Sequence, residues 1–174
     1  AIFLPHSAAV PAQPVPAGPS WTDLADLALA APVVLVGQIS EVDRLPRKET
    51  PGLPANEVRA LVQADLSAAL RSPSVLPRGA AWLWQGPADA RGRPPFGKET
   101  PVLVFARPLS GGARPEVQAL QLVSADAQVP WSAQAEADVR AILQAARQPG
   151  AAGLMVTGVR DAFASFAARR FDWV

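Results

Sequence analysis

Few side chains in this sequence could carry out chemistry. His6 is the only histidine, and the 174 residues include no cysteine. A chain without cysteine has no thiolate nucleophile, no disulfide and no cysteine-rich metal site. A catalytic dyad or a histidine-rich zinc site would have to be built around His6 alone. The sequence also lacks a Gly-x-Ser-x-Gly elbow, a phosphate loop and a dinucleotide fingerprint. We therefore expect no enzymatic activity, no cofactor and no bound metal.

Carboxylates give the one enzymatic alternative. Glu41 and Asp43 are two residues apart and share one face of a predicted strand, and Asp65 could lie opposite them if the strands pair suitably. Such a pair could act as a general acid and base. A solvated strand face is the simpler interpretation of the same residues.

Basic and aromatic residues suggest a second alternative. Arg78, Arg91, Arg93 and Lys98 flank a short predicted strand that carries Trp82 and Trp84. Tryptophans beside arginines are typical of barrels that bind single-stranded nucleic acid by base stacking. Against this, the net charge is only +1, so no strong positive field attracts a polyanion. The tryptophans could instead fill the core of the domain.

Both ends of the chain differ from its middle. Residues 5–19 contain five prolines, which exclude a helix and favour an extended arm. The apolar start before this arm has no basic flank, so it is not an intact signal peptide, and we expect either a processed N-terminus or a trimmed one. We predict that the ends and the tryptophan strand contact a partner, through Ile2, Phe3, Leu4, Trp82, Trp84, Arg91, Arg93, Phe171 and Trp173.

The middle of the chain contains the predicted helices and strands. Ser20 and Asp23 form a capping box for a helix that ends at Pro32. A strand from Val33 to Val42 follows, and Gly37 interrupts its alternation, which predicts a bulge and a strongly coiled strand. The most regular alternation, with period two, runs from residue 57 to 68 and predicts a long half-buried strand.

Later segments complete the prediction. We expect strands at 80–85, 102–106 and 117–123, and a helix that Ser132 caps and that Pro149-Gly150 stops. Beyond residue 148 we expect a strand at 154–157 and a helix around 162–168. The predicted organisation is a proline-rich arm (1–19), an OB-like domain with flanking helices (20–147) and a C-terminal extension (148–174).

The order of these elements predicts a mainly β fold with flanking helices (α+β). A five-stranded OB-like Greek-key barrel would hide the strand edges, with a short N-terminal helix and a C-terminal amphipathic helix outside it. The longest apolar run, residues 27–36, is too short to cross a bilayer, which takes about 20 residues. We expect no transmembrane segment, although peripheral proximity to a membrane stays open.

Several stretches together resemble the netrin and tissue-inhibitor-of-metalloproteinase (TIMP-like) superfamily in its bacterial forms. They are Ala25-Asp26 with 33–37, the 58–66 strand, the glycine-led 97–106 stretch ending in Phe105-Ala106, and Pro130-Trp131 before the last helix. The resemblance spans about residues 20–147 and implies an OB-fold. Inhibitors of that superfamily chelate a protease's zinc with an N-terminal cysteine. This chain starts Ala1-Ile2-Phe3 and has no cysteine, so that mechanism does not carry over.

The functional expectation follows from the absent catalytic motifs and the apolar, proline-rich ends. We expect a non-enzymatic binding or accessory subunit that is periplasmic or otherwise exported. It would dock on a protein partner or a larger envelope assembly through its extended termini. The alternatives are a single-stranded nucleic-acid-binding OB domain and a protease-inhibitor-like domain without the cysteine mechanism.

Overall fold

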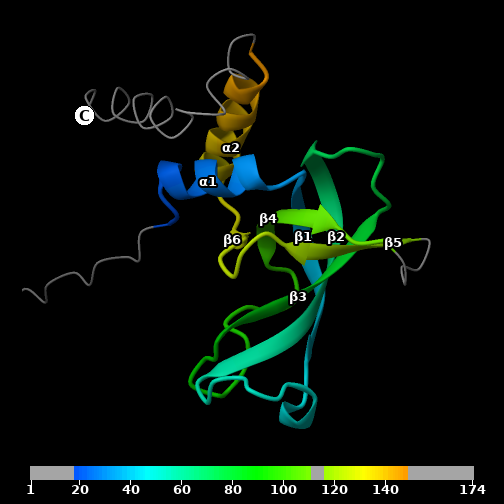
Figure 1. Cartoon of the computed structure of the whole chain (residues 1–174), viewed down its shortest axis with the longest axis vertical. Helices are drawn as coiled ribbons and strands as arrows, with labels where there is room; N and C mark the ends of the chain where they lie inside the picture. The colour runs from blue at the N-terminus through cyan, green and yellow to red at the C-terminus, as the bar shows by residue number, and fades with distance from the viewer. Residues whose placement is uncertain (1–17, 111–115, 149–174) are drawn as a thin grey trace, which may run out of the picture.

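A computed structural model describes residues 18–110 and 116–148 (Figure 1). The elements are α1 (Trp21–Ala30), β1 (Val33–Arg44), a 3-10 turn η1 (Arg47–Glu49), β2 (Glu57–Arg71), β3 (Gly79–Pro87), β4 (Pro101–Pro108), β5 (Val117–Leu122), β6 (Gln128–Pro130) and α2 (Ala133–Ala146). The predictions for Ile2, Phe3, Leu4, Phe171 and Trp173, and for elements after residue 148, lie outside the described residues.

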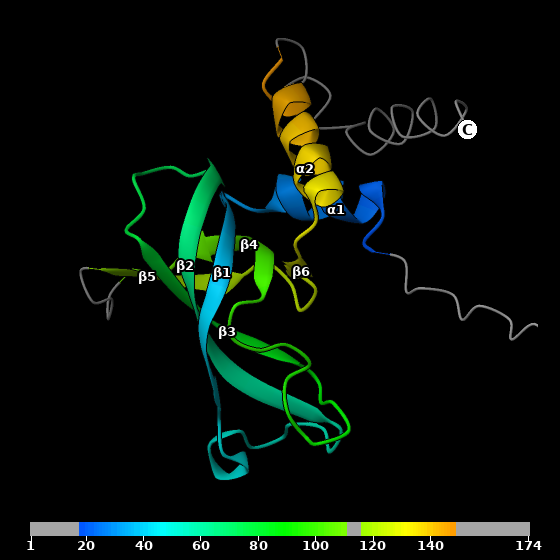
Figure 2. The same ribbon diagram turned by 180° about the vertical axis from the view of Figure 1, so that it is seen from behind.

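The strands form a closed barrel. Their order is β1-β2-β3-β5-β4, and pairing of β4 with β1 closes the sheet. β3 and β5 run parallel, while the other neighbouring strands are antiparallel. β6 continues along the edge of β4 beyond β5. The two helices lie together at one end of the barrel, as the opposite views in Figures 1 and 2 show. The prediction of a mainly β, OB-like five-stranded barrel with two flanking helices is confirmed.

Gly37 lets β1 bend across the barrel. The β1–β2 register shifts on both sides of it, between Val36 and Gly37 and between Ile39 and Glu41. A Cβ on Gly37 would lie 2.9 Å from the backbone oxygen of Asp65, a distance that real Cβ atoms essentially never show. Only glycine allows β1 and β2 to approach this closely. The bulge predicted around Gly37 is confirmed as these shifts in register.

Alternation along the strands divides the apolar residues between two cores. One set fills the barrel, including Val33 and Leu35 from β1 and Val102 and Val104 from β4. The intervening side chains, such as Val34 and Phe105, point outward and pack against α1 and α2. The first half of β1 and the middle of β4 are therefore buried on both faces, which explains why these stretches read as nearly continuous apolar runs.

Both predicted helix caps are present. The Ser20 hydroxyl accepts a hydrogen bond from the backbone N–H of Asp23 at 3.1 Å, and the Asp23 carboxylate accepts one from the backbone N–H of Ser20 at 3.0 Å. The Ser20 hydroxyl also donates to the Asp23 carboxylate at 2.7 Å, and this hydrogen bond, followed by that from the Ser20 backbone N–H, holds the pKa of Asp23 below its usual value. Ser132 caps α2 through the N–H of Ala135 at 3.0 Å. Each cap satisfies a backbone donor that the first helical turn leaves unpaired.

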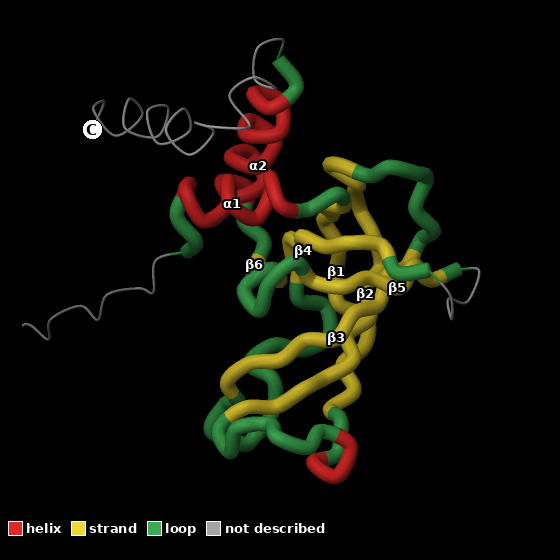
Figure 3. Tube along the Cα trace, viewed as in Figure 1, coloured by secondary structure: helices red, strands yellow, loops and turns green. Residues whose placement is uncertain are grey.

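One end of the β2–β3 pair projects from the barrel. The first half of β2 and the second half of β3 lie side by side there, next to the loops that follow β1 and β3 (Figure 3). Arg47 holds the loop after β1 in shape, because its guanidinium donates to the carbonyls of Leu53, Pro54, Ala55 and Glu57 at 2.7–3.4 Å. Arg47 therefore has a structural role.

Candidate functional site

The main candidate site is a groove along one edge of β3. β5 pairs with β3 only from Gly79 to Trp82, so the rest of β3 has no strand on that side among the described residues. Two adjoining hollows, of about 450 and 430 Å³, lie along this part of β3. We call the two hollows together the β3 groove. One wall is formed by residues 83–87, and the other is formed by residues from the segment 120–130. Trp84, Gln85 and Ala125 line both hollows.

Exposed leucines mark one end of the groove. Leu83 and Leu109 are 54% and 45% exposed, and both line the same hollow. Leu61 lies directly opposite Leu83 in the β2–β3 register, so a half-buried leucine extends the apolar area across the outer sheet face. Exposed leucines that gather on one face of a domain often mark a contact surface for another protein.

A polar network borders these leucines. The Arg59 guanidinium donates to the side-chain oxygen of Gln85 at 2.7 and 3.2 Å. The Gln85 amide in turn donates to the Glu57 carboxylate at 2.8 Å. The three side chains hold one another in place, and their charges cancel. The outer face therefore combines an apolar centre with a pre-ordered polar rim of no net charge.

The two tryptophans of β3 point into the barrel. Trp82 is 1% exposed, and its indole N–H donates to the side chain of Gln128 at 2.8 Å. Trp84 is 7% exposed and contacts Phe96 edge to face, with 4.9 Å between ring centroids. Of the two alternatives that the sequence left open for these rings, the structure shows the one in which they fill the core. Neither ring is placed for base stacking, and only Trp84 reaches the groove, as part of its lining.

Gly86 makes room for the ring of Trp84. A Cβ at this position would lie 2.5 Å from one carbon of the indole and 2.8 Å from another. Because the indole is a rigid, buried ring in contact with Phe96, it has little freedom to move away. The position of Trp84, and with it the lining of the groove, depends on this glycine.

Arg91 and Arg93 lie in the loop after β3, and both are exposed. The Asp89 carboxylate accepts hydrogen bonds from the backbone N–H groups of both arginines at 2.9 Å. These hydrogen bonds, that of Arg93 first, lower the pKa of Asp89. The Arg93 guanidinium is 4.0 Å from the same carboxylate. The structure thus places these two arginines together in one turn, apart from the exposed leucines of the groove.

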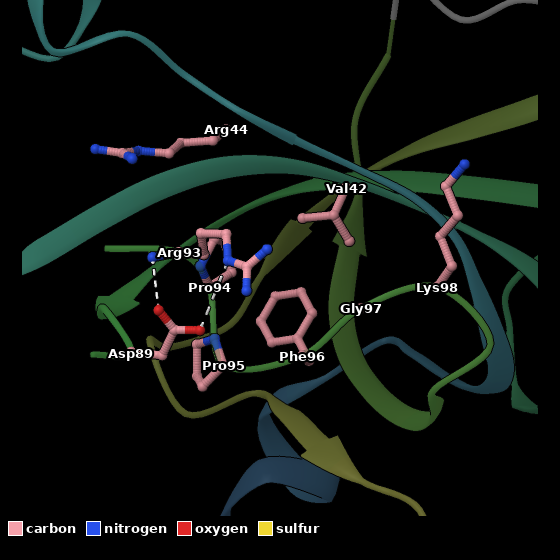
Figure 4. Close-up of a pocket in the computed structure, with 9 residues that line it drawn as sticks. All are labelled: Val42, Arg44, Asp89, Arg93, Pro94, Pro95, Phe96, Gly97 and Lys98. Atoms are coloured by element: carbon pink, nitrogen blue, oxygen red, sulfur yellow. Dashed lines mark hydrogen bonds and ion pairs between the residues drawn. The ribbon is translucent and has the colours of Figure 1, made fainter. Parts of the chain in front are cut away.

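A third hollow, of about 670 Å³, lies between this turn and the end of β1. Figure 4 shows the Phe96 ring below Val42 in its middle. Arg44, Arg93 and Lys98 also line it, and Figure 4 shows the charged ends of Arg44 and Lys98 on opposite sides of the view. Arg93 has the Asp89 carboxylate as its partner, so the three cations do not converge on one anion.

The candidate carboxylates do not come together. Asp65 pairs with Gln38, whereas Glu41 and Asp43 lie opposite Gln63 and Leu61. The register shifts around Gly37 move Asp65 out of line with the other two. Within residues 18–110 and 116–148, no group of three or more histidine, cysteine, aspartate or glutamate side chains is placed to hold a metal ion. None of the described helices is long and apolar enough to cross a membrane.

Sequence reasoning missed the outer-face leucines and the groove. The signal for Leu61 was present, since it stands on the otherwise polar side of the alternating 57–68 stretch. Leu83, between two tryptophans, was read only as part of the strand. The open edge of β3 depends on where β5 stops pairing, and no local pattern encodes that.

No family model matches the sequence, and no curated protein matches it either. The fold and the β3 groove are therefore the grounds on which a function can be argued.

Proposed function

We propose that this chain is a non-enzymatic, exported binding or accessory subunit that docks on a protein partner. The observation that carries the proposal is the pair of exposed leucines, Leu83 and Leu109, on one face of the barrel beside the groove. A periplasmic location, an envelope assembly as the partner and membership of the TIMP-like superfamily belong to the same proposal. They are supported by the sequence patterns and the OB-like barrel.

The chemistry of this face favours protein over nucleic acid. Its centre is aliphatic, and its rim consists of Arg59, Gln85 and Glu57, which bond to one another. Protein interfaces combine an apolar centre with a polar rim in this way. Nucleic-acid surfaces instead need unpaired cations for the phosphates and exposed rings for the bases. Here the arginine is already paired, and both β3 tryptophans are buried.

Site-specific photo-crosslinking tests the proposal. A photoreactive phenylalanine analogue replaces Leu83 in the protein expressed in its native cell. The matched control carries the analogue at Val75, which is apolar and 97% exposed but does not line the groove. We expect one discrete protein adduct from position 83 and none of that size from position 75. Identical adducts at both positions, or none at position 83, would count against a docking face here.

A further inference from the structure

The hollow between the turn at residues 89–93 and the end of β1 is a second candidate site. Its volume of about 670 Å³ lies within the usual range of ligand pockets. The described residues that line it are distinct from those that line the β3 groove. Among them are three cations, Arg44, Arg93 and Lys98, and one carboxylate, Asp89. This balance of charge favours an acidic ligand.

Two of the three cations keep their charge toward solvent. Arg93 is 4.0 Å from the Asp89 carboxylate and is therefore partly neutralised. Among the described residues, no carboxylate lies within ion-pair distance of Arg44 or Lys98. Both side chains are exposed. The carboxylates of a ligand can therefore pair with them without displacing an ion pair of the described domain.

The end of β1 supplies one apolar and one basic side chain to the hollow. Val42 and Arg44 both line it, and they share one strand face because they are two residues apart in a regular stretch of the β1–β2 register. Glu41 and Asp43 alternate with them, so these carboxylates belong to the other face. A Cβ on Gly92 would lie 3.8 Å from Nη1 of Arg44, which places this guanidinium beside the turn.

An apolar surface separates the two exposed cations. Figure 4 shows the charged ends of Arg44 and Lys98 on opposite sides of the view, with Val42 and Phe96 between them. The Phe96 ring is held by its edge-to-face contact with Trp84, at 4.9 Å between centroids. A ligand that uses the whole lining must therefore carry an apolar group with an acidic group on either side of it.

Hydrogen bonds hold the loop of residues 88–100, which forms most of the lining, in place. The Asp89 N–H donates to the carbonyl of Arg93 at 2.7 Å, and the Glu99 N–H donates to the carbonyl of Ile39 on β1 at 2.7 Å. A loop that is ordered before binding loses less conformational entropy when a ligand arrives. The hollow is therefore a preformed surface.

We propose that this hollow binds an acidic peptide segment of a protein partner, in which one apolar side chain lies between carboxylates. The apolar side chain packs on Phe96 and Val42. A carboxylate on one side of it pairs with Arg44, and a carboxylate on the other side pairs with Lys98. Nucleic acid fits this surface less well, because the Phe96 ring is half-buried and offers no open face for base stacking.

Fluorescence anisotropy with a labelled Glu-Glu-Leu-Glu-Glu peptide at low ionic strength tests the proposal. Acidic residues at both neighbouring positions on each side make the probe independent of the exact spacing between the cations. We expect the reference peptides Gln-Gln-Leu-Gln-Gln and Glu-Glu-Ser-Glu-Glu to bind about fourfold more weakly or worse, because each lacks one half of the chemistry.

Substitutions in the chain locate the site. Arg44→Gln and Lys98→Gln should each weaken binding by about two- to fivefold, the range for exposed ion pairs. Their effects should multiply in the double variant, since each cation pairs with a different carboxylate. The matched control combines Arg78→Gln with Arg107→Gln, which removes the same charge at exposed positions outside the hollow. It should weaken binding less than either single variant.

Backbone NMR should show the largest peptide-induced shifts at residues 96–98. The proposal is overturned by any of four results: no binding of the acidic peptide, equal weakening by the control and the double variant, an oligothymidylate that binds as tightly, or shifts centred on Leu83. The docking face at Leu83 and Leu109 is tested through other residues, so the two proposals fail separately.

Discussion

Gly86→Ala should destabilise the barrel far more than a glycine-to-alanine change normally does. The new methyl group would lie 2.5 Å from the Trp84 indole, so the ring must move. Overpacking of a core typically costs about 1–3 kcal/mol. Disturbing the edge-to-face contact with Phe96, whose centroid is 4.9 Å away, adds up to about 1 kcal/mol. We expect the free energy of unfolding to fall by about 1–4 kcal/mol.

Urea denaturation followed by far-ultraviolet circular dichroism measures this change without relying on tryptophan fluorescence. Gly97→Ala is the matched control, because a Cβ there meets no atom within 4 Å. It should change the stability by less than about 0.5 kcal/mol.

A double-mutant cycle locates the cause. Trp84→Leu alone is destabilising, since it leaves a cavity. In that background, Gly86→Ala has no indole to collide with and should cost less than about 0.5 kcal/mol. The reasoning fails if Gly86→Ala is as mild as Gly97→Ala, or if its cost is the same with and without the indole.

Four further outcomes follow from the same structure. Gly37→Val should destabilise the fold by more than about 2 kcal/mol, because its Cβ meets the Asp65 backbone oxygen at 2.9 Å; thermal unfolding beside Gly97→Val checks this. Ser20→Ala removes the N-cap and should cost about 1 kcal/mol in denaturant unfolding. It also removes the hydroxyl that donates to the Asp23 carboxylate, so the pKa of Asp23, measured by NMR titration, should rise toward its usual value. Trp82→Phe should cost about 1–3 kcal/mol, since it leaves the Gln128 side chain without its indole donor; Trp131→Phe, which removes an exposed indole bond to Glu136, should cost less. Stability should fall in acid, because hydrogen bonds lower the folded-state pKa values of Asp23, Asp89 and Glu136. This stabilisation is complete above the ordinary pKa values of 3.8 for aspartate and 4.5 for glutamate, and it is lost as the pH falls through the lowered folded-state pKa values. A stability that stays constant between pH 5 and pH 2 would contradict this prediction.

Most of the fold could be predicted because its signals are local. The capping box at Ser20, the period-two alternation of β2 and the interruption at Gly37 each depend on residues close together in the chain. These patterns place the strands and the two helices to within a few residues. Closing five such strands into a barrel then follows from the need to pair their edges.

The features that escaped prediction depend on long-range geometry. β6 has three residues and forms only by pairing with β4. The register shift after Ile39 determines that Asp65 faces Gln38, and alternation alone cannot show such a shift. Likewise, alternation shows that Trp82 and Trp84 share a face, but barrel closure decides that this face is the interior. The β3 groove exists because β5 diverges after Leu120, which no local pattern records.

The most direct test of the docking proposal is the effect of Leu83→Arg on complex formation in the native cell. Leu83 is 54% exposed, so the substitution should leave the stability of the isolated chain within about 0.5 kcal/mol. We predict that the native complex, followed by size-exclusion chromatography of the cell extract, is lost with Leu83→Arg and retained with Val75→Arg. A complex that survives Leu83→Arg unchanged would contradict a docking face at Leu83 and Leu109.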